Sequence, residues 1–214
     1  MASLAAYRDP DRLSGTAQNL NTPGKEFDLV TPPLRQRIRV RRGQIGDIPL
    51  LLRYAEAAMG VPLAPQATVT RIACRHPDSV WSFWRHDRLV GGAALLMLNA
   101  HGLAALLDNS IDLADPPPAI FADAGRRPAA IYVWAILGAA SAAEGIADVI
   151  VRMQQHPYGS ADLFAIPATD DGLRFTRGLG FHLVPDHPRA LYRYVRLANR
   201  TQPSGDEFDE CYSA

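Results

Sequence analysis

Three things are scarce in this sequence: long apolar runs, cysteine and net charge. No apolar run approaches the roughly 18 to 20 residues that cross a bilayer, so we expect no membrane-spanning helix and no membrane partner. Basic and acidic side chains number 22 each, which gives a net charge of zero. Because proteins bind nucleic acids largely through the phosphates, this neutrality argues against nucleic acid as the main partner.

The few cysteines and histidines also restrict the function. Cys74 and Cys211 lie far apart in the chain, which predicts neither a disulfide framework nor a zinc site. The six histidines show no metal-ligand spacing, so we expect no metal. The N-terminal stretch lacks the basic flank and apolar run of a secretory signal. A reducing cytoplasm is therefore the compartment we expect.

The composition of the whole chain, 48% hydrophobic and 21% charged, is typical of a soluble globular protein. Residues 1–36 are polar and proline-rich without a sustained period, which predicts a flexible arm. Residues 199–214 have a similar composition with several acidic residues, and we expect a flexible acidic tail there. The segment 37–198 is predicted to form one domain.

Hydrophobic periodicity within that domain predicts strands and helices that follow one another along the chain. The expected strands are 37–41, 79–85, 89–98, 129–137, 163–166, 181–184 and 191–197. The run 89–98 is apolar almost throughout, so we expect a central strand buried on both faces there. The expected helices run from an N-cap at Asp47 to Gly60, from about 142 to 155, and from a Thr169 cap to about 178, and residues 100–128 are expected to be mostly loop with a short helix. The fold class is therefore α/β (α+β), with a mixed central β-sheet flanked by helices in a single domain.

The segment from Thr169 to Phe181, TDDGLRFTRGLGF, resembles the late helix of the GNAT superfamily of acyl-CoA-dependent N-acyltransferases, commonly written N-x-x-A-x-x-F-Y-x-x-L-G-F. We expect Leu173, Phe175 and Leu179 to pack inward. Gly180 is expected to end the helix in the left-handed conformation that favours glycine.

A second segment, Ala142 to Ala147 (AAEGIA), follows the strand 129–137 and a small-residue stretch from Gly138 to Ser141. It is similar to the acyl-CoA loop of the same superfamily, R/Q-x-x-G-x-G/A. A helix N-terminus suits a diphosphate because its first amides are unpaired donors and its dipole favours an anion. We expect the small side chains at 143, 145 and 147 to let the backbone approach the ligand closely.

The resemblance covers about 36–197 and implies a GNAT-like fold with acetyl-CoA or another acyl-CoA as co-substrate. Pantetheine would lie beside the strand 129–137, whose amides would polarise the thioester. The cofactor-binding residues that the resemblance implies are Trp134, Ile136, Leu137, Gly138, Ala142, Ala143, Glu144, Gly145, Ile146, Ala147, Thr169 and Phe175.

The sequence departs from the superfamily at its catalytic positions. Ala142 stands where Arg or Gln is usual, Thr169 replaces the Asn and Thr176 replaces the Tyr that protonates the departing thiolate. The position of the common strand carboxylate is Ile131. A threonine hydroxyl is too weak an acid for that protonation, although it can donate a hydrogen bond to sulfur.

Three residues remain as catalytic candidates: Tyr132, Thr176 and Asp108. Tyr132 would donate a proton near the thioester, although a core tyrosine fits the pattern better. Asp108, like Asp112, Asp115 and Asp123, lies in the loop where an amine acceptor would bind, but loop aspartates usually serve turns and caps.

Two functions stay open at this point. The first is an N-acyltransferase that moves an acetyl or longer acyl group from acyl-CoA to a primary amine, borne by a small molecule or by a protein. The alternative is a catalytically degenerate protein of the same fold that serves as a binding or regulatory module. Trp81, Phe83 and Trp84 fit an acyl tunnel, a homodimer contact or ordinary packing equally well.

Overall fold

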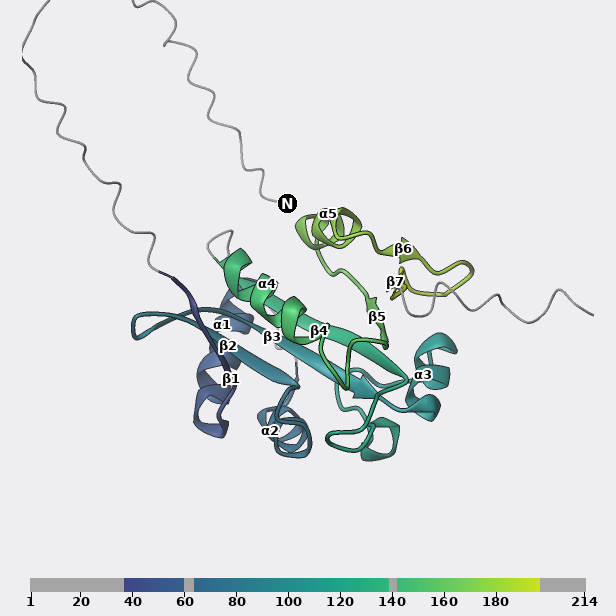
Figure 1. Cartoon of the computed structure of the whole chain (residues 1–214), viewed down its shortest axis with the longest axis horizontal. Helices are drawn as coiled ribbons and strands as arrows, with labels where there is room; N and C mark the ends of the chain where they lie inside the picture. The colour runs from purple at the N-terminus through teal and green to yellow at the C-terminus, as the bar shows by residue number, and fades with distance from the viewer. Residues whose placement is uncertain (1–36, 60–63, 139–141, 197–214) are drawn as a thin grey trace, which may run out of the picture. The chain divides into compact units, whose positions relative to one another are not determined.

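The computed structural model describes residues 37–59, 64–138 and 142–196. The predicted arm 1–36 and tail 199–214, the expected helix end at Gly60 and the end of the loop at Ser141 lie outside the described residues. The described chain forms one seven-stranded sheet in the order β1-β2-β3-β4-β5-β7-β6 (Figure 1). Its strands are β1 (Arg39–Arg42), β2 (Val80–Arg85), β3 (Arg88–Leu98), β4 (Ala130–Gly138), β5 (Asp162–Ala165), β6 (His182–Leu183) and β7 (Tyr192–Tyr194).

The sheet is mixed, as the sequence predicted. Only the β4–β5 pair is parallel, and the other five pairs are antiparallel. β3 is a long strand with neighbours on both sides and is buried along most of its length. This confirms the expectation that its nearly continuous apolar run, 89–98, forms a central strand buried on both faces.

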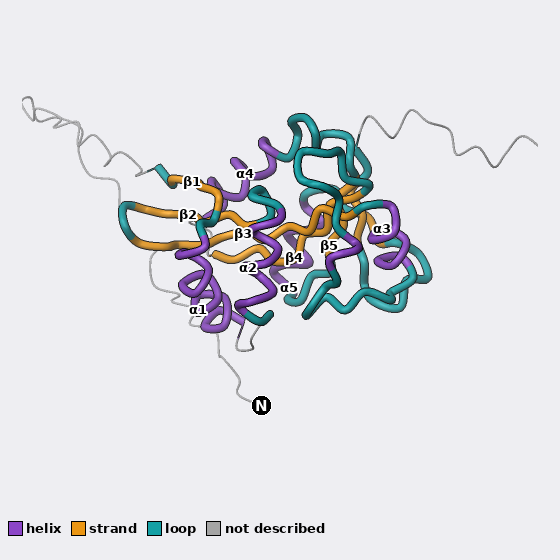
Figure 2. Tube along the Cα trace, turned by 90° about the horizontal axis from the view of Figure 1, so that it is seen from below, coloured by secondary structure: helices purple, strands orange, loops and turns teal. Residues whose placement is uncertain are grey.

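Helices cover both faces of the sheet (Figures 1 and 2). Their bounds are α1 (Ile48–Met59), α2 (Gln66–Arg75), α3 (Ala100–Leu107), α4 (Ala143–Arg152) and α5 (Asp170–Gly178). Apolar residues of α1, α2 and α3 pack on one face, and those of α4 and α5 pack on the other. Within the described ranges no helix is long and apolar enough to cross a membrane.

The structure differs from the sequence-based expectation at α2 and at the turn before α1. Periodicity did not predict α2, because it begins after Pro65 without a side-chain cap and its first turn holds threonine and valine, which are weak helix formers. Before α1, residues Ile45–Asp47 form a 3-10 turn. The Asp47 carboxylate there accepts hydrogen bonds from the Gln44 backbone N–H (3.3 Å), Arg41 and Ser82, and so stabilises the turn before α1.

The late helix begins and ends as predicted but packs differently. Thr169 Oγ1 accepts the N–H of Gly172 at 3.0 Å, and Gly180 has a φ of +85°. Leu173 packs on the core, whereas Phe175 and Leu179 are each 38% exposed and Thr176 is buried. The expectation that Phe175 and Leu179 pack inward was therefore wrong, because the buried side of α5 follows positions 173, 176 and 180.

Candidate functional site

β4 carries an irregularity at the middle of its length. Ala94 of β3 pairs with Ala135, and the next residue, Leu95, pairs with Val133, so Trp134 is an extra residue in β4. Such a bulge shifts the alternation of side chains. Trp134, Ala135 and Leu137 accordingly line the α1–α2 side of the sheet. The indole N–H of Trp134 donates to the carbonyl of Leu113 at 2.9 Å, which fixes the ring.

Beyond the bulge, β4 loses its partner on the β5 side. The last parallel pair is Val133 with Ala165, while β4 itself continues to Gly138. In the part of the chain that the structure describes, residues 134–138 have a strand partner only on β3. We call the β5-facing side of residues 134–138 the open edge of β4. Unpaired strand edges present backbone N–H and C=O groups that an extended ligand can bind.

Apolar side chains remain exposed on β4 beside this open edge and on α5. Ile136 of β4 is 38% exposed, as are Phe175 and Leu179 of α5. Arg177 donates to the Tyr192 hydroxyl at 3.1 Å, so its side of α5 faces β7. Phe175 lies two residues earlier, about 200° around the helix, on the flank turned away from β7. Because β5 separates β7 from β4, that flank lies on the side of β5 where β4 runs.

The helix α4 starts close to the end of β4, so its N-terminus lies there. Its N-cap, Ala142, makes no side-chain capping bond, and the first N–H groups of any α-helix have no acceptor within the helix itself. Ala142 itself is fully buried, and a Cβ at Gly91 would lie 3.1 Å from the Ala142 Cβ. A long side chain at this position would meet the sheet, so the buried Ala142 does not face a ligand.

The small residues of this turn serve two different purposes. Ala143 and Ala147 are exposed, as a ligand-facing role requires. Gly145 is buried, and a Cβ there would lie 2.8 Å from Cγ of Phe83. Its lack of a side chain therefore allows close packing on the sheet, which corrects the expectation that it makes room for a ligand. Glu144 is partly exposed, forms an ion pair with Arg37 (3.6 Å) and accepts the Ile38 N–H.

The three catalytic candidates do not come together. Tyr132 is buried in the cluster on the α3 side of the sheet, whereas Thr176 is buried on α5, which packs on the opposite face. Asp108 is exposed at the C-cap of α3. Ile131, at the position of the usual carboxylate, is fully buried in the core.

Burial raises the pKa of Tyr132 to about 12, and the nearby charge of Arg189 offsets part of this rise. A phenol with so high a pKa is a poorer acid than a free tyrosine. The described structure therefore favours the core role of Tyr132 that the sequence pattern also favoured.

Replacing Tyr132 by phenylalanine should flatten the alkaline loss of stability. In the folded protein the pKa of Tyr132 lies above the ordinary value of 10. The stability that depends on its protonated form is therefore complete below pH 10 and is lost as the pH rises toward 12. Two pKa units correspond to about 3 kcal/mol. Urea unfolding between pH 8 and 12 measures the free energy of unfolding of the two proteins. Tyr158, whose pKa is also raised to about 12, causes part of the alkaline loss of stability in both. Identical profiles of stability against pH for wild type and Tyr132→Phe would contradict the raised pKa of Tyr132.

The loop aspartates have structural partners. Asp112 accepts the N–H of Ala114 at 2.9 Å, and Asp115 accepts hydrogen bonds from Thr68 and Arg71 of α2, both at 2.7 Å. Asp123 lies 3.6 Å from Arg75 of the same helix. Two of these side chains thus fasten the loop to α2, a role that could not be predicted while α2 itself was missed.

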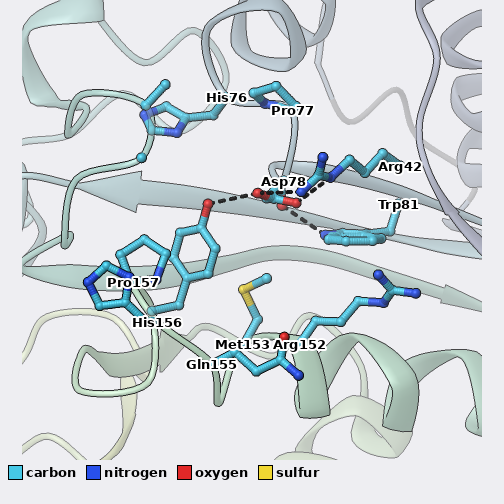
Figure 3. Close-up of a pocket in the computed structure, with 13 residues that line it drawn as sticks. Arg42, His76, Pro77, Asp78, Trp81, Arg152, Met153, Gln155, His156 and Pro157 are labelled. Carbon is cyan, nitrogen blue, oxygen red and sulfur yellow. Dashed lines mark hydrogen bonds and ion pairs between the residues drawn. The ribbon is translucent and has the colours of Figure 1, made fainter.

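Two cavities accompany this site. The first, of about 90 Å³, lies between α1, α2 and strands β2–β4, and every residue that lines it is apolar except for the indole N–H of Trp134. Sequence reasoning missed its helix residues, among them Leu51, Ala55 and Val69, because they have the spacing of ordinary core positions. The second cavity, of about 360 Å³, lies at the C-terminal end of α4 (Figure 3).

The remaining sequence candidates are accounted for by packing. Trp81 and Phe83 are almost completely buried in the core, and Trp84 packs beneath the guanidinium of Arg41 at 4.4 Å. Tyr192 and Tyr194 face the same cluster, as alternate positions of one strand should. Within the described residues no group of three or more potential metal ligands occurs.

No family model matches the chain, and no curated protein matches it. Among solved structures, the loading GNATL domain of CurA from Lyngbya majuscula aligns with a TM-score of 0.57 at 13% identity, over 74% of this chain and 97% of that one. An acetyltransferase from Streptococcus agalactiae aligns with a TM-score of 0.47 at 10% identity, over 75% of this chain and 99% of that one. The GNAT-like decarboxylase GphF, solved with isobutyryl-CoA, aligns with a TM-score of 0.45 at 16% identity, over 66% of this chain and 72% of that one.

At 13% identity and a TM-score of 0.57, the likeness to the first of these structures establishes the fold and nothing more. The chain has a GNAT-like fold. The resemblance of the two sequence motifs to that superfamily is thus confirmed at the level of fold.

Proposed function

We propose that this protein is an N-acyltransferase that binds acyl-CoA at the open edge of β4. The observation that carries the proposal is the parting of β4 from β5 after Val133, next to the bulge at Trp134. Pantetheine is itself an extended chain with two amide groups, and residues 134–138 would pair with it as a strand pairs with its neighbour. Exposed Ile136 and Phe175 would cover its apolar parts.

The diphosphate would lie at the first turn of α4. The first N–H groups of the helix would supply donors, and the helix dipole favours an anion. Ala143 and Ala147 leave the turn open to a ligand, and Glu144 is held by Arg37 and by the Ile38 N–H. Ile146 and Gly145 would contribute through the backbone, and Thr169 would contact the cofactor from the start of α5.

The chemistry would depend mainly on positioning. The amine nitrogen of the acceptor attacks the thioester carbonyl, the C–S bond breaks, and CoA leaves as a thiolate that takes up a proton. Backbone amides near the bulge would stabilise the oxyanion, and water would accept the proton of the amine. Tyr132 is too weak an acid for protonating the thiolate, and Thr176 would at most donate a hydrogen bond.

The apolar cavity of about 90 Å³ beside Trp134 would take the acyl group. Its size suits a short chain, and its apolar wall offers nothing to a charged amine. The acceptor amine would therefore approach from elsewhere, and the sequence suggested the loop 100–128 and the first helix, 48–59. A cytoplasmic location is part of the same proposal.

Calorimetric titration with CoA, acetyl-CoA and a long-chain acyl-CoA tests the binding site. We expect dissociation constants in the micromolar range, and Ala143→Glu should weaken binding about tenfold or more because its carboxylate would lie beside the diphosphate. Ala104→Glu, which adds the same charge to an exposed position of α3, should bind like the wild type. Unchanged affinity in Ala143→Glu would overturn the diphosphate site, and a folded wild type that binds none of the three would overturn the proposed function.

One observation favours the alternative of a binding or regulatory module: the catalytic candidates Tyr132 and Thr176 lie on opposite faces of the sheet. A protein that binds acyl-CoA but releases no thiol from it, with or without a panel of amines, would support that alternative. Release of CoA thiol that depends on one amine would support the transferase and would identify the acceptor class.

A further inference from the structure

The cavity of about 360 Å³ at the C-terminal end of α4 is not explained by acyl-CoA binding (Figure 3). The proposed diphosphate position is at the other end of the same helix. The cavity is formed by the end of β1, the turn before β2, the loop at 124–125 and the residues that follow α4. Its volume falls in the lower part of the range for small-molecule sites.

The single carboxylate in the cavity wall is already bound. Asp78 accepts Nε of Arg42 at 2.6 Å and Nη2 at 3.3 Å, and the hydroxyl of Tyr158 donates to it at 2.8 Å. Burial and this carboxylate raise the pKa of Tyr158 to about 12, so the phenol keeps its proton and its donor role at neutral pH. Asp78 therefore has little capacity left for a cationic ligand.

A second guanidinium in the wall has no acid beside it. Arg152 lies along Trp81, with its Cζ 5.3 Å from the ring centroid, and across the cavity from His156 and Pro157 (Figure 3). Among the described residues no aspartate or glutamate comes within 4 Å of it. Two guanidinium groups and one carboxylate thus line the cavity, which leaves an excess of one positive charge.

The rest of the wall combines donors with apolar surface. Gln155 and His156 are exposed polar residues of the wall, whereas Met153, Pro77 and Pro157 are apolar. We propose that this cavity binds a small organic anion, whose carboxylate or phosphate pairs with Arg152 and whose apolar body lies on Pro77 and Pro157. Arginine suits this role because its planar fork binds two anionic oxygens at once.

Calorimetry on the full chain with three probes tests the site. Phenyl phosphate has the anion and the apolar body, inorganic phosphate has only the anion, and benzyl alcohol has only the body. We expect phenyl phosphate to bind most tightly of the three. Arg152→Gln should weaken it about tenfold or more. Arg174→Gln, at an exposed arginine on α5, should leave its affinity unchanged.

A second variant and a competition experiment separate this site from the proposed acyl-CoA site. Ala124→Trp should fill the cavity from its loop and abolish binding of phenyl phosphate, and thermal unfolding confirms that each variant is folded. Saturating CoA should not displace the probe. Equal affinity in Arg152→Gln and wild type, displacement by CoA, or no binding of any probe would overturn the proposal. Because the probes do not require acyl-CoA binding, the two proposals can fail separately.

Discussion

Replacing Gly145 by leucine should lower the free energy of unfolding by about 3 kcal/mol, because there is no room for a side chain at this position. Already a Cβ would lie 2.8 Å from Cγ of Phe83, whose ring is fully buried between β2 and α4. The ring cannot move aside without disturbing the close packing of the core. Urea unfolding followed by circular dichroism measures the change.

A pair of alanine variants isolates the packing contribution. Gly145→Ala and Gly178→Ala make the same change within a helix, and alanine is the better helix former by up to about 1 kcal/mol. A Cβ at Gly178 of α5 would meet nothing within 4 Å, so Gly178→Ala should be neutral or stabilising. Gly145→Ala should be destabilising. If both variants were equally stable, Gly145 would not be required for packing, and its role would be sought in ligand binding.

Replacing Asp162 by alanine should lower the free energy of unfolding by about 3 kcal/mol. This buried carboxylate joins β5 to β7 and to the segment that follows β7. It accepts Nε and Nη2 of Arg193 at 2.8 and 2.5 Å, and the backbone N–H of Arg196 at 2.9 Å. Removing the acceptor leaves the buried Arg196 amide without this partner. Arg193 is about half exposed and can be rehydrated, so the loss is smaller than for a fully buried ion pair.

Asp123→Ala is the matched control for Asp162→Ala. The Asp123 side chain is 82% exposed and lies 3.6 Å from Arg75, so its loss should change stability by less than about 0.5 kcal/mol. Asp162→Asn should recover part of the stability, since the amide oxygen can still accept the Arg196 N–H. Equal costs for the two alanine variants would show that burial of the carboxylate is not what makes Asp162 important.

Local sequence predicted the elements whose causes are local. The Thr169 cap and the left-handed Gly180 depend on residues within a few positions of each other, and both are confirmed. The continuous apolar run 89–98 was sufficient to place β3 inside the sheet. By contrast α2 has no side-chain cap and a weak first turn, and its packing on the sheet is what stabilises it.

The candidate site was predictable only in part. The motif at 142–147 pointed to the end of β4 and the start of α4, and the structure has the bulge and the open edge in that region. The roles of individual small residues were not predictable, because Ala143 and Gly145 look equivalent in the sequence while one is exposed and the other touches Phe83. Similarly, the apolar spacing of 173, 175 and 179 did not distinguish the buried side of α5 from its exposed flank.

The sequence by itself determined the order of the strands along the chain and the two ends of α5, because caps, turns and periodicity act between near neighbours in the chain. Its two motifs carried the resemblance to a GNAT-like fold. The tertiary structure alone decided which candidates meet. Tyr132 and Thr176 lie on opposite faces of one sheet, and the cavity of Arg42, Asp78 and Arg152 gathers residues from distant segments. Such juxtapositions depend on strand order and helix packing, which no local pattern records.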